Sequence, residues 1–248
     1  MSGFIIYISW GDKIRLILEF KSLNNCKYYD ITKYDIQGFI YSLIKDDLIF
    51  KNYHDVIGFK FFTFSNIFPV SDFKEGTIKK LIISSPNSKF IHALEYSLKN
   101  KENIHLSKLD IEVESLKIIN PKKLGKFISS TPIVLFEDNS KNQYYSFKNN
   151  PDFDFFFNRL KDNAVKKYNA YTGNDFVLED NLFNSFEFNR EVSVRVRKNN
   201  NTFVIIGSLW RNLEADINKE NKGFYKFLLD TGLGEKNSLG FGMLNDVR

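Results

Sequence analysis

The sequence predicts an α+β protein in which the element order βαββαβ occurs twice, giving two antiparallel sheets. Short runs of branched and aromatic residues, typical of strands, alternate with segments whose apolar residues recur at 3.6-residue spacing, typical of helices. The polar, proline-containing segment 120–123 divides the 248 residues into two halves, each long enough for its own core. We therefore expect an N-terminal domain over 1–120 and a C-terminal domain over 121–248.

The N-terminal half begins with a strand over 14–20, after a leading segment over 1–12 to which we assign no role. A helix over 33–46 follows, because its apolar residues share one face, which leaves Gln37 and Tyr41 along the flank. The unit is completed by strands over 59–65 and 80–84, a helix over 88–99 and a strand over 111–119. This order is the ferredoxin-like (RRM-like) plan.

The C-terminal half repeats this plan in architecture, without visible repetition of sequence. Its expected elements are strands over 127–136 and 144–147, a helix over 151–168, strands over 192–197 and 203–209, a helix over 219–229 and a final strand after residue 242. In the strand over 192–197, valines alternate with Ser193, Arg195 and Arg197, so one face is apolar and the other cationic, with Lys198 at the end.

Composition and charge restrict the class of protein. The net charge of +5 suits a polyanionic partner without requiring one. Cys26 is the only cysteine, so the chain can form neither an internal disulfide framework nor a cysteine-rich zinc site. The apolar run at 4–8 is too short to span a membrane or to form a secretory core. We expect a soluble protein of the cytoplasm.

The stretch 228–244 contains four glycines, at 232, 234, 240 and 242, around the polar sequence Glu-Lys-Asn-Ser. An apolar run precedes them and alternating apolar residues follow, which predicts a helix, a glycine-rich loop and a strand. Glycines permit positive φ and let the backbone approach a ligand closely, so exposed amides can bind phosphates, and Lys236 would add a mobile positive charge. By itself, a short Gly-x-Gly pattern is more often only a turn.

Two separated motifs point to one family. The string Gly-Leu-Gly-Glu-Lys-Asn-Ser-Leu-Gly-Phe-Gly at 232–242 resembles the signature loop of the CRISPR-associated endoribonucleases that cut precursor CRISPR RNA into guide RNAs. Those enzymes belong to the repeat-associated RNA-binding superfamily and have two ferredoxin-like domains in tandem. The segments 37–41 and 53–65 resemble the N-terminal block of the archaeal members, whose active-site tyrosine, histidine and lysine correspond here to Tyr41, His54 and Lys60.

The resemblance implies RNA cleavage without a metal ion or other cofactor. Such cleavage needs a 2′-hydroxyl aligned with its own phosphate, proton-transfer groups and positive charge near the phosphorane. His54, with an unperturbed pKa of about 6.5, is the best group to protonate the 5′-oxygen, whereas Tyr41, at about 10, is a poor base and could instead orient the 2′-hydroxyl. Lys60 would stabilise the phosphorane, although a lysine at a sheet edge can also be purely structural. The products would be a 2′,3′-cyclic phosphate and a 5′-hydroxyl.

The RNA-binding surface is expected in the second domain, which helps to hold the repeat in the family that this chain resembles. Without that resemblance, alternating charge on a strand is usually only a solvated face. The residues expected to bind RNA are Arg195, Arg197, Lys198, Gly232, Gly234, Lys236, Asn237, Ser238, Gly240 and Gly242. The expected partner is CRISPR repeat RNA, and the sequence leaves open both a homodimer and membership of a CRISPR effector complex.

Three alternatives compete with this interpretation. The first is a non-catalytic subunit that holds repeat RNA on the same fold, and the second is a generic two-domain RNA-binding protein, whose Lys/Arg-Gly-Phe-Gly-Phe motif is not evident here. The third is a metal-dependent nuclease, with Asp46 and Asp47 or Asp152 and Asp154 as carboxylate ligands. The second pair sits beside a proline at a predicted helix start, where acidic residues are common without any metal, and we prefer that explanation.

Overall fold

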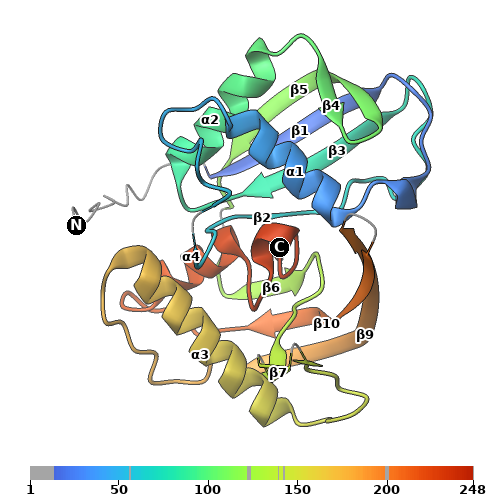
Figure 1. Ribbon diagram of the computed structural model, residues 1–248. Helices are drawn as coiled ribbons and strands as arrows, with labels where there is room; N and C mark the ends of the chain where they lie inside the picture. The colour runs from blue at the N-terminus through green and yellow to red at the C-terminus, as the bar shows by residue number, and fades with distance from the viewer. Residues whose placement is uncertain are drawn as a thin grey trace.

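The computed structural model describes residues 14–55, 57–121, 124–138, 140–141, 143–198 and 201–247. The predicted leading segment 1–12 lies outside these residues. The chain forms two βα units, one above the other, and each contains a main sheet with two helices (Figure 1). All strand pairs that the structure describes are antiparallel, which confirms the predicted fold class.

The first unit follows the predicted order of elements with one addition. Its main sheet has the strand order β2-β3-β1-β5-β4, which is the ferredoxin-like order once the short edge strand β4 is set aside. Residues 59–62 of the predicted strand 59–65 lie outside regular structure, so that only β2 pairs with β3. Its elements are β1 (Arg15–Ser22), α1 (Lys33–Ile44), β2 (Thr63–Phe64), β3 (Ile78–Ser84), α2 (Ser88–Asn100), β4 (Ile104–Leu106) and β5 (Leu109–Ile119).

The second unit has the equivalent strand order, β11-β6-β10-β9. The predicted strand 127–136 is divided, because β6 ends at Ser129 and β7 begins at Phe136, with Ile133 forming an isolated bridge to Ser208. The elements are β6 (Lys126–Ser129), β7 (Phe136–Asp138), β8 (Gln143–Tyr144), α3 (Phe153–Thr172), β9 (Ser185–Lys198), β10 (Asn201–Glu214), α4 (Lys222–Thr231), the short 3₁₀ helix η2 (Asn237–Leu239) and β11 (Leu244–Asp246).

Local sequence explains where the helices begin. Thr32 and Asp35 form a capping box at the start of α1, in which each side chain bonds the backbone N–H of the other residue. Asn87 accepts hydrogen bonds from the first turn of α2, and Asp152 does the same for α3. Gly173, in the left-handed conformation, ends α3.

Each sheet and its helices enclose an apolar core. In the first unit, Leu16, Leu18 and Phe20 alternate along β1 and are fully buried together with the apolar faces of α1 and α2. In the second unit, the buried Trp210 of β10 stacks on Phe156 of α3, with ring centroids 5.5 Å apart. The high aromatic content of the sequence is thus used largely for packing.

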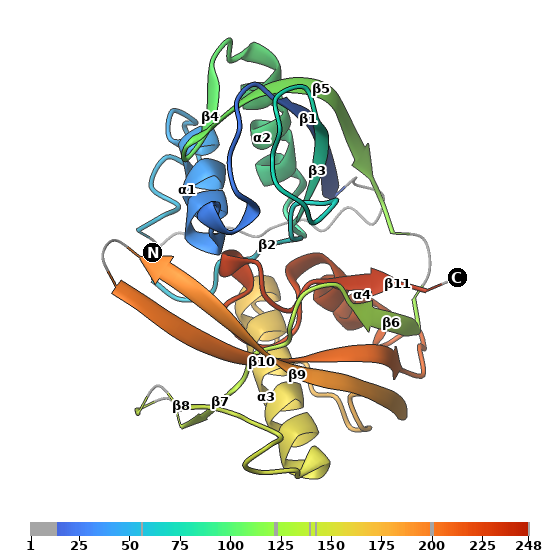
Figure 2. The ribbon, with the colours of Figure 1, turned by 90° about the vertical axis from the view of Figure 1, so that its right-hand side faces the viewer.

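The two units contact each other closely. Arg15 of β1 is only 4% exposed and donates hydrogen bonds to the carbonyl oxygens of Leu229, at 2.9 Å, and Leu244, at 3.0 Å, in the second unit. The ring of Phe61 lies 4.9 Å from that of Tyr171. Figure 2 shows the second unit's glycine-rich segment, between α4 and β11, rising against the lower end of α1. The interface therefore lies beside the helix that carries Tyr41.

Candidate active site

Tyr41, His54 and Lys60, the three predicted catalytic residues, lie close together. The ring of Tyr41, on the flank of α1, meets the imidazole of His54 edge-on, with centroids 5.0 Å apart. The ammonium of Lys60 donates hydrogen bonds to the backbone oxygens of Tyr53, at 2.8 Å, and His54, at 3.0 Å. The loop between α1 and β2 therefore turns back on itself, so that the ring of His54 contacts Tyr41 and its backbone oxygen bonds Lys60.

His54 is the most accessible of the three residues. Its side chain is 71% exposed, and its Nδ1 lies 2.9 Å from Oδ1 of Asp55. When Nδ1 is protonated and donates a hydrogen bond to this carboxylate, Nε2 is left to exchange a proton with a ligand. The arrangement suits a proton donor that meets its substrate at the surface.

Burial controls the protonation of the other two side chains. Desolvation, with a smaller contribution from the neighbouring Tyr53, raises the pKa of Tyr41 well above its ordinary value. Tyr41 therefore keeps its proton near neutral pH and can donate a hydrogen bond. Desolvation lowers the pKa of Lys60, and the carboxylate of Asp55 opposes that shift.

Tyr53 supports the site, and sequence reasoning gave it no role. Its hydroxyl accepts a hydrogen bond from the backbone N–H of Phe61 at 3.2 Å, and its ring lies 5.7 Å below the ammonium of Lys60. Burial raises the pKa of Tyr53 to about 12. Its position directly before His54 could have drawn attention to it as a residue near the site. The sequence does not show, however, that its ring packs against the core aromatic residues Phe50 and Phe90.

The glycine-rich loop (232–242) is packed between the two units. From α1, Lys33 donates to the carbonyl oxygen of Gly240 at 2.7 Å, and Gln37 donates to that of Ser238 at 2.9 Å. From β2, the hydroxyl of Thr63 donates to the carbonyl oxygen of Phe241 at 3.2 Å. Lys33, Gln37 and Tyr41 follow each other at four-residue spacing, so one flank of α1 holds the loop and also carries the candidate active-site tyrosine.

Four glycines of the loop have positive φ and close neighbours within the protein. A Cβ at Gly240 would collide with the ring of Phe64, and one at Gly242 would collide with the carbonyl group of Leu233. The corresponding neighbours are Asn237 for Gly232 and the carbonyl oxygen of Val134 for Gly234. Packing inside the protein is thus sufficient reason for glycine at these positions.

Lys167 of α3 supports the loop from inside the second unit, a role that no pattern in the sequence indicates. Its ammonium is buried and donates to the carbonyl oxygens of Gly232, at 2.7 Å, and Gly234, at 3.2 Å, and to Oδ1 of Asn237 at 2.6 Å. Nδ2 of Asn237 donates to the carbonyl oxygens of Leu233 and Phe241. The buried side chain of Asn237 is therefore committed to the loop's own structure, and in this conformation it is not presented to a ligand as the sequence led us to expect.

The predicted basic residues fall on different sides of β9. Arg195, Arg197 and Lys198 are all exposed. Because neighbouring residues of a strand point to opposite faces, Lys198 does not extend the face of the arginines. Its ammonium instead lies 5.5 Å from the ring of Tyr34 at the start of α1. Lys236 and Ser238 of the glycine-rich loop are partly exposed.

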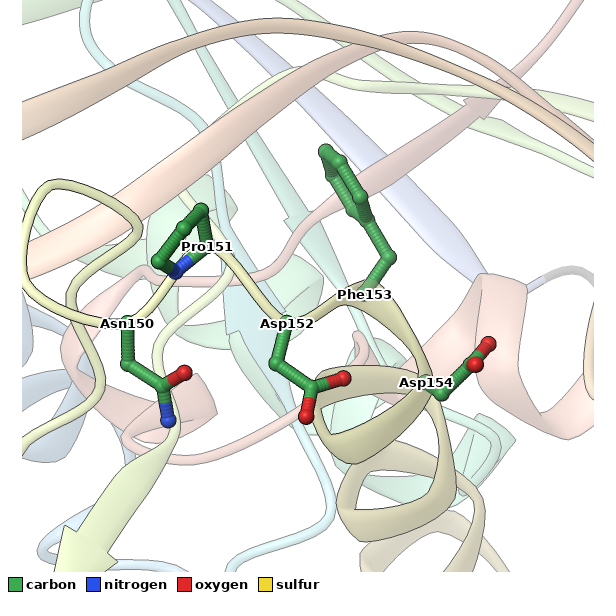
Figure 3. Close-up of a pocket in the computed structure, with 5 residues that line it drawn as sticks. All are labelled: Asn150, Pro151, Asp152, Phe153 and Asp154. Carbon is green, nitrogen blue, oxygen red and sulfur yellow. The ribbon is translucent and has the colours of Figure 1, made fainter.

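The acidic pair at the start of α3 forms a helix cap. Asp152 and Asp154 line an open hollow with Asn150, and their carboxylates do not converge (Figure 3). Oδ1 of Asp152 accepts a hydrogen bond from the N–H of Phe155 at 2.9 Å, as the capping interpretation predicts. Oδ1 of Asp47 likewise accepts bonds from two N–H groups of its own turn. No cluster of three or more potential metal-ligating side chains is found in the described part of the chain.

Among the helices of the described residues, none combines the length and apolar character needed to cross a bilayer.

Comparison with known proteins identifies the family. A family model described as CRISPR associated protein Cas6, C-terminal, matches residues 114–245. The CRISPR-associated endoribonuclease Cas6 2 of Methanocaldococcus jannaschii is 43% identical over 248 residues, covering 95% of this chain and 100% of the relative. A solved structure described as CRISPR associated protein Cas6 is 27% identical, with a TM-score of 0.70 over 95% of this chain and 99% of its own. The sequence motifs, the tandem ferredoxin-like fold and these matches together show that the chain belongs to the Cas6 family.

Proposed function

We propose that this protein is an endoribonuclease that cleaves precursor CRISPR RNA within its repeats and requires no metal ion. The observation that carries the proposal is the contact between Tyr41 and His54, with Lys60 bonded to the backbone of the same histidine. Residues from α1 and from the loop that follows it thus lie together at one partly exposed place. The relative from Methanocaldococcus jannaschii that is 43% identical is named an endoribonuclease, which supports the same activity for this protein.

The geometry suggests a role for each residue. Tyr41, protonated at neutral pH, orients the 2′-hydroxyl of the nucleotide before the cut. As the 2′-oxygen attacks the adjacent phosphorus, the proton of the 2′-hydroxyl passes to solvent water, the bond to the 5′-oxygen breaks, and that oxygen takes a proton from His54. Lys60 stabilises the negative charge of the phosphorane. The products are a 2′,3′-cyclic phosphate and a 5′-hydroxyl.

Incubation with the CRISPR repeat RNA of the source genome in excess EDTA tests this proposal. A second RNA carries a 2′-deoxy nucleotide at the cut site and is otherwise identical. We expect cleavage of the first RNA at one position and none of the second, since the attacking hydroxyl is missing. Tight binding without cleavage would contradict the enzymatic proposal and indicate a repeat-binding subunit. Cleavage that EDTA abolishes would contradict the metal-independent mechanism.

A further inference from the structure

Four partly buried aromatic residues gather where the glycine-rich loop, α1, β7–β8 and the β9–β10 hairpin meet. Phe136 and Tyr144 stack, with centroids 4.9 Å apart and planes at 21°. Tyr34 and Phe203 meet edge-on at 6.1 Å. Tyr34, Tyr144 and Phe203 pack on one small apolar core that includes Phe241 of the loop. We call these four residues the aromatic cluster.

Two lysines lie over the rings of the aromatic cluster. The ammonium of Lys236 is 5.1 Å from the ring centre of Phe136 and 5.8 Å from that of Tyr144. The ammonium of Lys198 is 5.5 Å from the ring centre of Tyr34. Cations at these distances are attracted by the ring faces. The cluster thus combines aromatic rings with positive charge from the end of β9 and from the glycine-rich loop.

The backbone at Lys236 gives an independent indication of function. Lys236 has a φ of 56°, and Ser107 is the other non-glycine residue with positive φ in the described part of the chain. A β-carbon is disfavoured in this conformation, which glycines adopt at four other positions of the same loop. A lysine retained in an unfavourable conformation, with its ammonium over stacked rings, is the kind of outlier that is found at binding sites.

We propose that the aromatic cluster is a stacking subsite for an unpaired nucleotide of the bound RNA. The ring of Tyr144, with Tyr34 beside it, receives a base, and Lys236 and Lys198 contact the adjoining phosphates. Proteins recognise unpaired RNA in this way, by stacking bases on aromatic rings and pairing the backbone with cations. The subsite rests on the proposed function, because its ligand is the RNA that the active site would cut.

The subsite lies within reach of the candidate active site. Tyr34 and Tyr41 are seven residues apart on α1, which is two turns and about 10 Å along the helix axis. Lys33 and Gln37, on the same helix, bind the glycine-rich loop. Figures 1 and 2 both show the end of the β9–β10 hairpin beside the start of α1. An RNA strand whose base is held in the subsite could therefore continue along α1 to His54.

Equilibrium binding to an uncleavable repeat RNA, with 2′-deoxy at the cut site, tests the subsite. In a series of such RNAs, each nucleotide in turn is replaced by an abasic one. We expect one or two abasic positions to weaken binding to the native protein by about 5-fold or more, as base–aromatic stacking implies. Y144L should lose affinity by a similar factor and should show no further loss at that abasic position. Y144F, which keeps the ring, should bind like the native protein.

Tyr96→Leu is the matched control, since Tyr96 is 72% exposed on α2 and lies outside the aromatic cluster. It should leave affinity unchanged. If Y144L binds the whole series as the native protein does, the subsite is overturned while cleavage by the native protein leaves the proposed function intact. If Y144L does not fold, the abasic series with the native protein decides, because the absence of any sensitive position overturns the subsite. If the native protein neither binds nor cuts repeat RNA, both proposals fall.

Discussion

The ring of Tyr41 meets the imidazole of His54 edge-on, with centroids 5.0 Å apart, although the two residues come from a helix and from the loop that follows it. The same tyrosine lies 5.9 Å from the buried ring of Phe62, so one side of it is part of the core and the other side faces the histidine. The contact therefore connects the exposed His54 to helix α1 through Tyr41.

His54→Ala should lower the rate of repeat cleavage by a factor of about 10² or more and leave RNA affinity nearly unchanged, because a general acid acts mainly in the transition state. Single-turnover cleavage and equilibrium binding with the uncleavable RNA measure the two effects. His92→Ala is the matched control, since His92 is exposed on α2 and interacts with Glu95. An equal loss of cleavage and affinity would make His54 a binding or folding residue.

Tyr41→Phe should lower cleavage by roughly 10-fold, because it removes one hydrogen-bond donor and keeps the ring contacts. The pH profile of the variant should have the same shape as that of the native protein, since the raised pKa of Tyr41 keeps its hydroxyl protonated over the neutral range. Single-turnover rates from about pH 6 to 9 would test this. If the cleavage rate of the native protein rises with pH on the alkaline side and that of the variant does not, Tyr41 acts as a base.

Lys236→Ala and Arg195→Ala should each weaken repeat binding and reduce its dependence on salt. For single-stranded RNA, each lost phosphate contact lowers the slope of log K against log salt by about 0.7. Binding over a range of salt concentrations measures the slope, with Lys89→Ala, on the exposed side of α2, as the control. A variant whose slope equals that of the native protein has lost no phosphate contact.

Lys167→Met should destabilise the protein by about 2 kcal/mol or more. The change leaves the carbonyl oxygen of Gly234 and Oδ1 of Asn237 without the donor that they share, and each unpaired buried acceptor is costly. The carbonyl oxygen of Gly232 keeps only the longer bond from the hydroxyl of Thr231, at 3.3 Å. Urea unfolding measures the difference in the free energy of unfolding. A Met variant as stable as the native protein would mean that burying the ammonium costs as much as its hydrogen bonds contribute.

The sequence was sufficient to predict both ferredoxin-like units, because the apolar spacing of α1, α2 and α4 and the alternation in β9 follow directly from burial on one face. It missed β4, which has only three residues, and merged β6 with β7, because local preferences do not show where a strand leaves its sheet. The motifs also singled out Tyr41, His54 and Lys60, which the structure brings together, and their catalytic roles stay a prediction.

The surroundings of the glycine-rich loop could not be predicted in the same way. Its glycines suit an exposed ligand loop and a tightly packed one equally well, and Lys33 and Lys167, which distinguish the two, lie 65 or more residues away. A buried lysine also contradicts the ordinary preference of the residue for solvent. For Lys167, two of the three partners are backbone oxygens, which leave no pattern in a sequence.

Asp230 should make the stability of the protein depend on pH. It is 1% exposed, its Oδ2 lies 3.4 Å from the ammonium of Lys226, and its Oδ1 is buried without a hydrogen-bond partner among the described residues. Burial raises its pKa to about 7, against the opposing charges of Lys226 and Arg15. Because the unfolded carboxyl titrates at about 4, its contribution to stability is fully present below that pH and is lost as the pH rises to about 7 and beyond.

Asp230→Asn has nearly the same shape and no charge, so it removes this dependence. The variant and the native protein should have similar free energies of unfolding near pH 4, and the variant should be more stable by at least about 1 kcal/mol at pH 8. Urea unfolding of both proteins at the two pH values gives the comparison, and other titrating groups cancel in the difference. If the difference between the two proteins does not change with pH, the carboxyl is ionised in the folded protein throughout, and Arg15 and Lys226 compensate its burial fully.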